Sequence, residues 1–252
     1  MFSTFEKHTH IRQTTMKNRV QTFIIRYTNE IKFSNLPQLR SAILKAMQYE
    51  ANVLFHNHID KEKLRYAYPL IQYKRINKRA AILCMNDGVN VIGEFLSKNS
   101  ATIELDGTPV TLSIDNVTPR TTTIQAWEDV VFRYNVRRWL PFNSENYEKF
   151  RNTESYIERV ALIEKILTAN ILSFFKGAGV TLERNIECNI LNLSEPQLLR
   201  FKNTKLMAFD VYFSSNVTLP DYIGIGKHVS VGFGTVVQER AEHKTAVKNK
   251  ND

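Results

Sequence analysis

The chain has 252 residues, a net charge of +9 and a hydrophobic content of 43%, ordinary values for a basic globular protein. It contains no run of roughly 20 apolar residues that could span a membrane, and its polar N-terminus lacks the apolar core of a secretory signal. We therefore expect a cytoplasmic protein that binds no membrane. The positive charge favours an anionic partner, of which nucleic acid is the commonest, although a basic enzyme of another kind would have the same composition.

The basic residues are concentrated in two segments. Between Lys61 and Arg79 a single acid, Glu62, accompanies seven cations, so this segment carries a net charge of +6. Such a density is typical of a surface that contacts nucleic-acid phosphates. The cations are Lys61, Lys63, Arg65, Lys74, Arg75, Lys78 and Arg79 in the first segment, and Arg133, Arg137 and Arg138 in the second.

The first half of the chain predicts the order strand, helix, strand, strand, helix, strand, which is a ferredoxin-like unit. The segment VQTFIIRYT is rich in β-branched and aromatic residues and favours a strand, and a stretch with apolar residues at helical spacing follows it. Asn77-Lys78 and Asp106-Gly107 indicate tight turns. We predict strands at residues 20–28, 68–76 and 79–85, a hairpin of 102–105 with 110–114, and helices at 36–51 and 89–97.

The second half predicts a similar unit that lacks its second helix. Residues 153–176 carry a broad apolar stripe at helical spacing, and Gly177 with Gly179 end this helix. A short glycine-bearing turn at 220–226 replaces the second helix. We predict strands at residues 129–136, 185–193, 205–214 and 229–238.

Together these patterns predict an α+β fold of two tandem ferredoxin-like (RRM-like) units, with a basic cleft between or across them. The boundary falls near residues 116–128. The expected division is a flexible N-terminal arm at 1–19, a first unit at 20–125 with a histidine loop, a second unit at 126–240 with a glycine-rich loop, and a polar tail at 241–252.

The histidine loop contains His56 and His58, just after the first predicted helix. Two imidazoles can act as general base and general acid near neutral pH. In RNA cleavage, one would take the proton of the 2′-OH and the other would protonate the departing 5′-oxygen. From so short a motif alone, two solvated loop histidines are the favoured interpretation. A metal site is a third, but apart from Asp60 the segment lacks further ligands at the usual spacing.

The glycine-rich loop is the segment from Gly224 to Gly234. It holds four of the nine glycines of the chain in eleven residues. Clustered glycines allow main-chain N–H groups to approach a phosphate closely. The segment matches neither the dinucleotide-binding pattern nor the P-loop. Bulges in an edge strand are the alternative interpretation. The four glycines are Gly224, Gly226, Gly232 and Gly234.

Aromatic residues lie among the cations. Bases of single-stranded RNA stack on such rings, although rings of this kind also fill protein cores. We expect Tyr134 in the core and leave the other rings open to both roles. They are Tyr66, Tyr68, Tyr73 and Trp139.

The second half resembles the repeat-processing endoribonucleases of CRISPR systems. The residues that carry the resemblance are Trp139-Leu140-Pro141-Phe142-Asn143 with Tyr147, Leu167 to Phe174, Ala208 to Val211, Asn216 to Pro220, and the glycine-rich loop ending in Gly232-Phe233-Gly234-Thr235. In the first half the resemblance depends on the fold pattern and the histidine pair. The chain is most similar to the form of this family that has two close histidines after the first helix.

The resemblance implies two ferredoxin-like units that bind precursor CRISPR RNA and cut its repeat without a metal or cofactor, leaving 5′-hydroxyl and 2′,3′-cyclic phosphate ends. It also implies that the product stays bound or passes to a CRISPR interference complex, and a homodimer is an open possibility. A repeat-binding module that does not cut, or a structural ribonucleoprotein subunit, is the alternative. Carried over to this chain, the catalytic candidates are His56, His58, Tyr66 and Lys74, with Tyr68 and His228 as further contenders. The candidate RNA contacts are Gly224, Gly226, Lys227, Gly232, Gly234, Arg65, Arg75, Arg79, Arg137 and Arg138.

Overall fold

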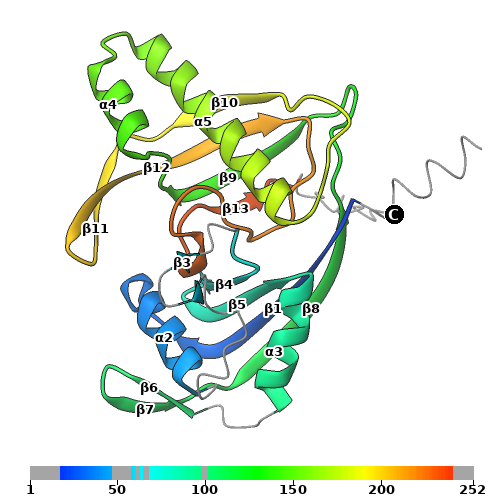
Figure 1. Cartoon of the computed structure of the whole chain (residues 1–252), viewed down its shortest axis with the longest axis vertical. Coiled ribbons are helices and arrows are strands. Elements are labelled where there is room, and N and C mark those ends of the chain that lie inside the picture. Colours follow the sequence, from blue (N-terminus) through cyan, green and yellow to red (C-terminus); the bar gives the residue numbers. More distant parts are fainter. Residues whose placement is uncertain (1–17, 47–57, 61–62, 65–67, 98–101, 241–252) are drawn as a thin grey trace, which may run out of the picture.

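The computed structural model describes residues 18–46, 58–60, 63–64, 68–97 and 102–240 (Figure 1). The predicted polar tail and nearly all of the predicted N-terminal arm lie outside these residues.

The first unit is a four-stranded antiparallel sheet with the order β4-β5-β1-β8. This is the strand order of a ferredoxin-like fold, and it confirms the predicted fold class. Both predicted helices are present. The elements are β1 (Arg19–Glu30), α2 (Leu36–Ala46), β4 (Ile71–Ile76), β5 (Arg79–Met85), α3 (Asp87–Ser97) and β8 (Ile114–Thr123), with a 3-10 turn η1 (Phe33–Asn35) before α2.

The turn between β4 and β5 shows how local sequence sets this sheet. Asn77 and Lys78 have φ of 50° and 67°. Two successive left-handed residues form the type of turn whose twist matches that of an antiparallel hairpin, and asparagine tolerates that conformation well. The predicted turn at this position is therefore confirmed.

The fourth strand of the first sheet differs from the prediction. The hairpin at residues 102–114 exists, but β6 (Thr102–Leu105) and β7 (Thr108–Thr111) form a small sheet of their own. The fourth strand is β8 (Ile114–Thr123), most of which lies in the stretch interpreted as the boundary between units. Among the strands that the structure describes, β8 pairs with β1 alone; it contains Pro119, and most of its residues are exposed. Without a buried face it has no apolar alternation that would have revealed it.

The second unit repeats the strand order of the first, as β10-β12-β9-β13, with β11 paired to β12. Helix α5 (Tyr156–Gly177) confirms the long predicted helix. The other elements are β9 (Phe132–Trp139), α4 (Ser144–Asn152), β10 (Cys188–Leu193), β11 (Gln197–Phe201), β12 (Thr204–Ser215), the 3-10 turn η2 (Val229–Val231) and β13 (Thr235–Gln238).

Two elements of the second unit were not predicted, and one prediction was too long. Helix α4 has no buried residue, so it carries no apolar stripe. Strand β11 is only five residues long. The predicted strand at 229–238 begins only at Thr235, because η2 occupies the first positions and Gly232 and Gly234 adopt positive φ.

The two units share their core. On β5, Ala81, Leu83 and Met85 belong to the same cluster of buried side chains as Tyr134 and Phe174 of the second unit. The alternate residues of β5 face the cluster that contains α2 and α3 side chains. Burial on both faces explains why residues 80–85 are a continuous apolar run rather than an alternating one.

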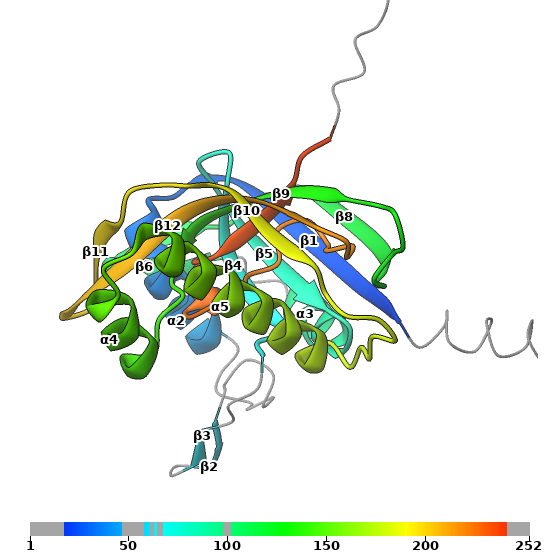
Figure 2. The same cartoon turned by 90° about the horizontal axis from the view of Figure 1, so that it is seen from above.

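The helices of both units lie on one side of the two sheets (Figure 2). The short strands β2 (His58–Asp60) and β3 (Lys63–Leu64) pair with each other and project on that same side. The glycine-rich loop lies between the units (Figure 1). Within the described ranges, no helix is both long and apolar enough to cross a membrane.

Candidate nucleic-acid interface around the glycine-rich loop

The glycine-rich loop connects β12 to β13 and packs against both units. Gly232 has φ of +90°, and a Cβ there would lie 2.5 Å from Leu36 Cδ1 of the first unit. Gly234 has φ of +60°, and a Cβ would lie 1.8 Å from the carbonyl oxygen of Ile225. A side chain does not fit at either position. Gly224 and Gly226 also contact neighbouring side chains closely, those of Val229 and Trp139 respectively.

These glycines therefore shape the loop and hold it between the units. Gly224, Gly232 and Gly234 are buried and Gly226 is half-buried. Their predicted contact with RNA stays a prediction, and the exposed side chains of the loop are better placed for such a contact.

Tyr68 ties the loop to the first unit. Its hydroxyl donates to the carbonyl oxygen of Gly224 at 2.6 Å and accepts from Nε2 of Gln72 at 2.9 Å. Its ring lies edge-on to Phe174 with centroids 5.2 Å apart. Burial raises the pKa of this phenol far above its ordinary value. In the arrangement described, Tyr68 is a link between the units rather than an exposed stacking platform.

Lys74 is a fully buried cation on the neighbouring strand β4, 1% exposed. Its Nζ donates to Oγ1 of Thr235 at 3.3 Å, and that hydroxyl donates to the carbonyl oxygen of Gly232 at 2.9 Å. Burial lowers the pKa of Lys74 to about 7, because an ammonium group is poorly solvated there. Lys74 can thus exchange a proton near neutral pH, next to the loop. Thr235, its partner, was not among the predicted site residues.

Arginines from both units gather beside the loop. The guanidinium of Arg138 lies 4.2 Å from the ring centroid of Phe33, which precedes α2. Burial lowers the pKa of Arg138, and the charges of Arg75 and Arg137 lower it further against the opposing effect of Asp210. The structure therefore brings together three of the predicted RNA contacts that are far apart in sequence.

The exposed tip of the loop carries Lys227 and His228. His228 has φ of 54°, and its ring lies 4.5 Å from that of Phe201 in the β11–β12 hairpin. Burial and the charges of Lys227 and Lys202 lower the pKa of His228. Lys202 and Phe201 were not predicted as site residues, because only the fold carries this hairpin to the loop.

Of the remaining predicted site residues, the structure describes Arg79 and His58. Arg79 pairs with Asp115 at 3.3 Å on the surface of the first unit. His58 begins β2. His56, Arg65 and Tyr66 lie outside the described residues. Among the residues described, no cluster of three or more histidine, cysteine or acidic side chains suits a metal ion.

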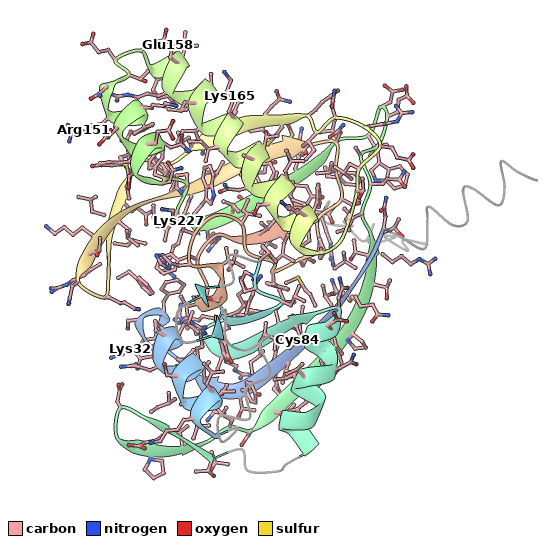
Figure 3. All side chains as sticks on the ribbon, in the orientation of Figure 1. Lys32, Cys84, Arg151, Glu158, Lys165 and Lys227 are labelled. Carbon is pink, nitrogen blue, oxygen red and sulfur yellow. The ribbon has the colours of Figure 1, made fainter. Side chains whose placement is uncertain are left out.

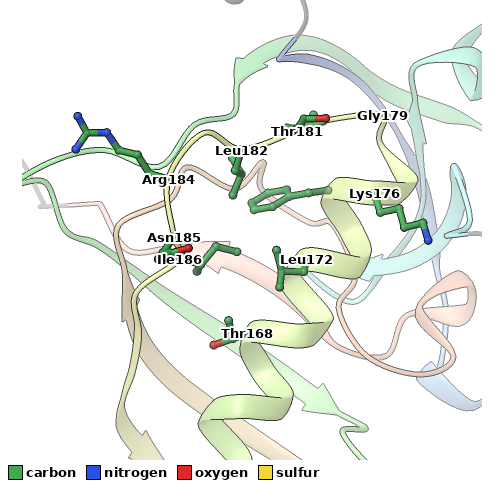
Figure 4. A pocket seen from close by; sticks show the side chains of 11 residues that line it. Thr168, Leu172, Lys176, Gly179, Thr181, Leu182, Arg184, Asn185 and Ile186 are labelled. Carbon is green, nitrogen blue, oxygen red and sulfur yellow. The ribbon is translucent and has the colours of Figure 1, made fainter.

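A broad hollow of about 830 Å³ lies at the C-terminal end of α5 (Figure 4). It is lined by side chains such as Leu172, Lys176 and Arg184, and Arg184 is paired with Glu128 at 2.7 Å. None of the predicted site residues that the structure describes lines it, so we place the candidate interface at the glycine-rich loop.

Sequence comparisons identify both units. The profile of the Cas6b N-terminal domain matches residues 18–123, and that of the Cas6b C-terminal domain matches residues 126–239. The uncharacterized protein MJ0978 of Methanocaldococcus jannaschii is 34% identical over 100 residues, which span 40% of this chain and 67% of that protein.

Two solved structures are similar throughout. One, described as a crystal structure of Cas6b, is 27% identical with a TM-score of 0.77, and the match covers 88% of this chain and all of that one. The other, described as the CRISPR RNA processing endoribonuclease Cas6b, is 28% identical with a TM-score of 0.66 and the same coverage. The CRISPR-Cas type IV endonuclease Csf5, 13% identical with a TM-score of 0.55, shares the fold.

Proposed function

Because the chain belongs to the Cas6b family, whose domain profiles match both of its units, we propose that it is an endoribonuclease that binds and cuts the repeats of precursor CRISPR RNA. The observation that carries this proposal is the match over both units together. A similar solved protein is described as a CRISPR RNA processing endoribonuclease. The net charge of +9 suits an RNA substrate.

We propose a metal-free reaction in which one of His56 and His58 takes the proton of the 2′-OH. The 2′-oxygen attacks the adjacent phosphorus, the bond from phosphorus to the 5′-oxygen breaks, and the other histidine protonates that leaving oxygen. The products are a 2′,3′-cyclic phosphate and a 5′-hydroxyl. Each such proton transfer contributes about 10²–10⁴-fold to the rate. Tyr66 and Lys74 assist, and the pKa of Lys74, about 7, supports a role in charge stabilisation or proton exchange.

We propose that the RNA backbone passes over the exposed side of the glycine-rich loop. The charges of Arg75 and Arg137 act on that of Arg138, whose main chain is hydrogen-bonded to Gly234 of the loop, and the exposed Lys227 belongs to the loop itself. Arg65 and Arg79 extend the basic surface in the proposal. Cations at this junction can neutralise several phosphates, so affinity should fall steeply with salt. The protein acts in the cytoplasm, and its product stays bound or passes to an interference complex; formation of a homodimer is a separate proposal, tested by light scattering.

The test is incubation of the purified protein with its labelled repeat RNA in excess chelator. We expect one cut with a cyclic-phosphate end. A 2′-deoxy substitution on the 5′ side of the cut should abolish cleavage, and cleavage of that RNA at the normal rate would disprove the mechanism. Strong inhibition by the chelator would indicate a metal site instead.

Variants assign the histidines. His56→Ala with His58→Ala should abolish cutting and leave RNA affinity within a few fold. His228→Ala is the matched control, since this imidazole lies in the other candidate segment. Loss of cutting in His228→Ala with cutting retained in the double variant would transfer the catalytic role to the loop. Tight binding without any cut in the unaltered protein would instead indicate a repeat-binding module.

A further inference from the structure

Leu140, Phe142 and Tyr147 line a small cavity that the proposed reaction does not use. The cavity measures about 290 Å³, close to the lower end of small-molecule sites at roughly 300 Å³. It lies where α4, the β11–β12 hairpin and the tip of the glycine-rich loop meet. The lining residues that matter below are Phe142, Asn143, Ser144, Tyr147, Lys205 and Lys227.

Aromatic packing holds one wall of this cavity rigid. Tyr147 is 37% exposed, and its ring lies edge-on to Phe142 with centroids 6.0 Å apart. Phe142 in turn packs on Phe150 at 4.9 Å and on Phe209 at 5.9 Å. Tyr147 therefore presents a partly open ring on a fixed support, which suits stacking of a flat ring.

The cavity is also electropositive. Lys205 and Lys227 line it and are exposed, and none of the described residues that line it is acidic. Within the described part of the chain neither lysine forms an ion pair. Asn143 and Ser144 bring the N-terminus of α4 to the same edge, where the helix dipole adds to the attraction for an anion.

The main chain of Lys227 is held against the wall of this cavity. The main-chain N–H of Lys227 donates to the carbonyl oxygen of Leu140 at 3.0 Å, and a Cβ on Gly226 would lie 2.7 Å from the indole of Trp139. The indole is itself held by a hydrogen bond of 2.9 Å from its Nε1 to Asn170. Lys227 lies between α4 and the first unit (Figure 3). These contacts fix the point from which the exposed Lys227 side chain extends.

We propose that this cavity is a subsite for one unpaired nucleotide of the repeat RNA, distinct from the histidines that cut. The base stacks on Tyr147, and the flanking phosphates contact Lys227 and Lys205. A nucleotide has a flat base that can stack on the ring of Tyr147 and phosphates that can contact Lys205 and Lys227. A peptide would pair with these two lysines only if it were acidic. The subsite rests on the proposed function, because it requires a repeat RNA as the bound molecule.

The experiment measures binding of the full-length protein to fluorescent repeat RNA, by anisotropy, with a series of RNAs that each lack one base. In the unaltered protein, one or two neighbouring abasic positions should lower affinity about five-fold or more, the size of one stacking contact. Tyr147→Ala should lower affinity for the intact repeat by the same factor. In Tyr147→Ala, removal of the base at that same RNA position should lower the affinity no further.

Matched variants separate this subsite from a loss of folding. Tyr147→Phe should keep the affinity of the unaltered protein, because the ring remains. Lys227→Ala should weaken binding several-fold and make it less dependent on salt. The controls are Tyr156→Ala and Lys165→Ala on α5, both exposed and outside the cavity, and both should leave affinity unchanged.

Two results would overturn the subsite. One is equal abasic penalties in the unaltered protein and in Tyr147→Ala at every position. The other is a Tyr147→Ala variant that binds RNA with unchanged affinity but no longer binds the interference complex. That result would make the cavity a protein-docking site. Both differ from failure of the proposed function, in which the unaltered protein itself neither binds nor cuts the repeat.

Discussion

The two units of this protein have the same strand order but differ in their second connection. In the first unit, α3 (11 residues) connects β5 towards β8 and buries apolar side chains of its own. In the second unit, residues 216–234 connect β12 to β13 with only one short 3-10 turn. A helix can cover a sheet by itself, whereas an irregular segment cannot satisfy its main chain without neighbours. The second connection therefore depends on the first unit, and this dependence creates the junction where the candidate site lies.

The glycines of the two connections test this difference most strongly. Gly234→Ala should reduce the free energy of unfolding by about 3 kcal/mol or more, because the added methyl group meets a main-chain oxygen at positive φ. Gly93→Ala in α3 should raise it by about 0.5–1 kcal/mol, since nothing lies within 4 Å of the added Cβ and alanine favours a helix. Urea unfolding measures both. Similar stabilities for the two variants would show that the connections do not differ as described.

The pH dependence of stability tests how much the buried ammonium group of Lys74 destabilises the fold where the two units meet. Because the folded-state pKa is lowered to about 7, the unfolded chain binds one more proton than the folded chain between about pH 7 and pH 10. Lys74 therefore destabilises the fold fully below pH 7, and this cost disappears as the pH rises through that window. The stability of Lys74→Met relative to the parent should therefore be about 4 kcal/mol greater at pH 6 than at pH 10. A stability difference that is constant with pH would contradict this assignment.

Tyr68 tests the hydrogen bond between the units. Tyr68→Phe leaves the Gly224 carbonyl oxygen and Gln72 Nε2 without the hydroxyl that they contact, and should cost about 1–2 kcal/mol. Tyr134→Phe is the matched control, since its hydroxyl contacts Val217 and Leu219 within the second unit. Hydrogen exchange should accelerate at residues 223–236 in Tyr68→Phe. If both variants accelerate exchange in this segment equally, Tyr68 has no special role at the junction.

Much of the fold could be predicted from local sequence patterns. The long apolar stripe of α5 and the left-handed turn at Asn77-Lys78 are local signals, and both are confirmed. Helix α4 and strand β8 were missed for one physical reason, since neither buries a continuous apolar face. An element that is mostly exposed leaves little trace in the periodicity of hydrophobic residues.

The candidate site could be predicted only in part from the sequence. Its residue types were visible, because cations, histidines and clustered glycines stand out in composition. Their partners were not, because Lys74 meets Thr235 and Arg138 meets Phe33 across large separations in sequence. For Tyr68, the choice between stacking on RNA and packing between the units also required the three-dimensional neighbours.

The sequence by itself determined the two ferredoxin-like units and the chemical character of the glycine-rich loop, because periodicity, turn residues and charge are properties of short segments. Only the tertiary structure decided what covers the second face of β5, why the loop needs its glycines, and which cations gather beside it. These features depend on contacts between residues far apart in the chain. The burial that lowers the pKa of Lys74 involves Thr235 of the other unit. The cavity beside Tyr147 forms where α4, the β11–β12 hairpin and the glycine-rich loop of the second unit meet.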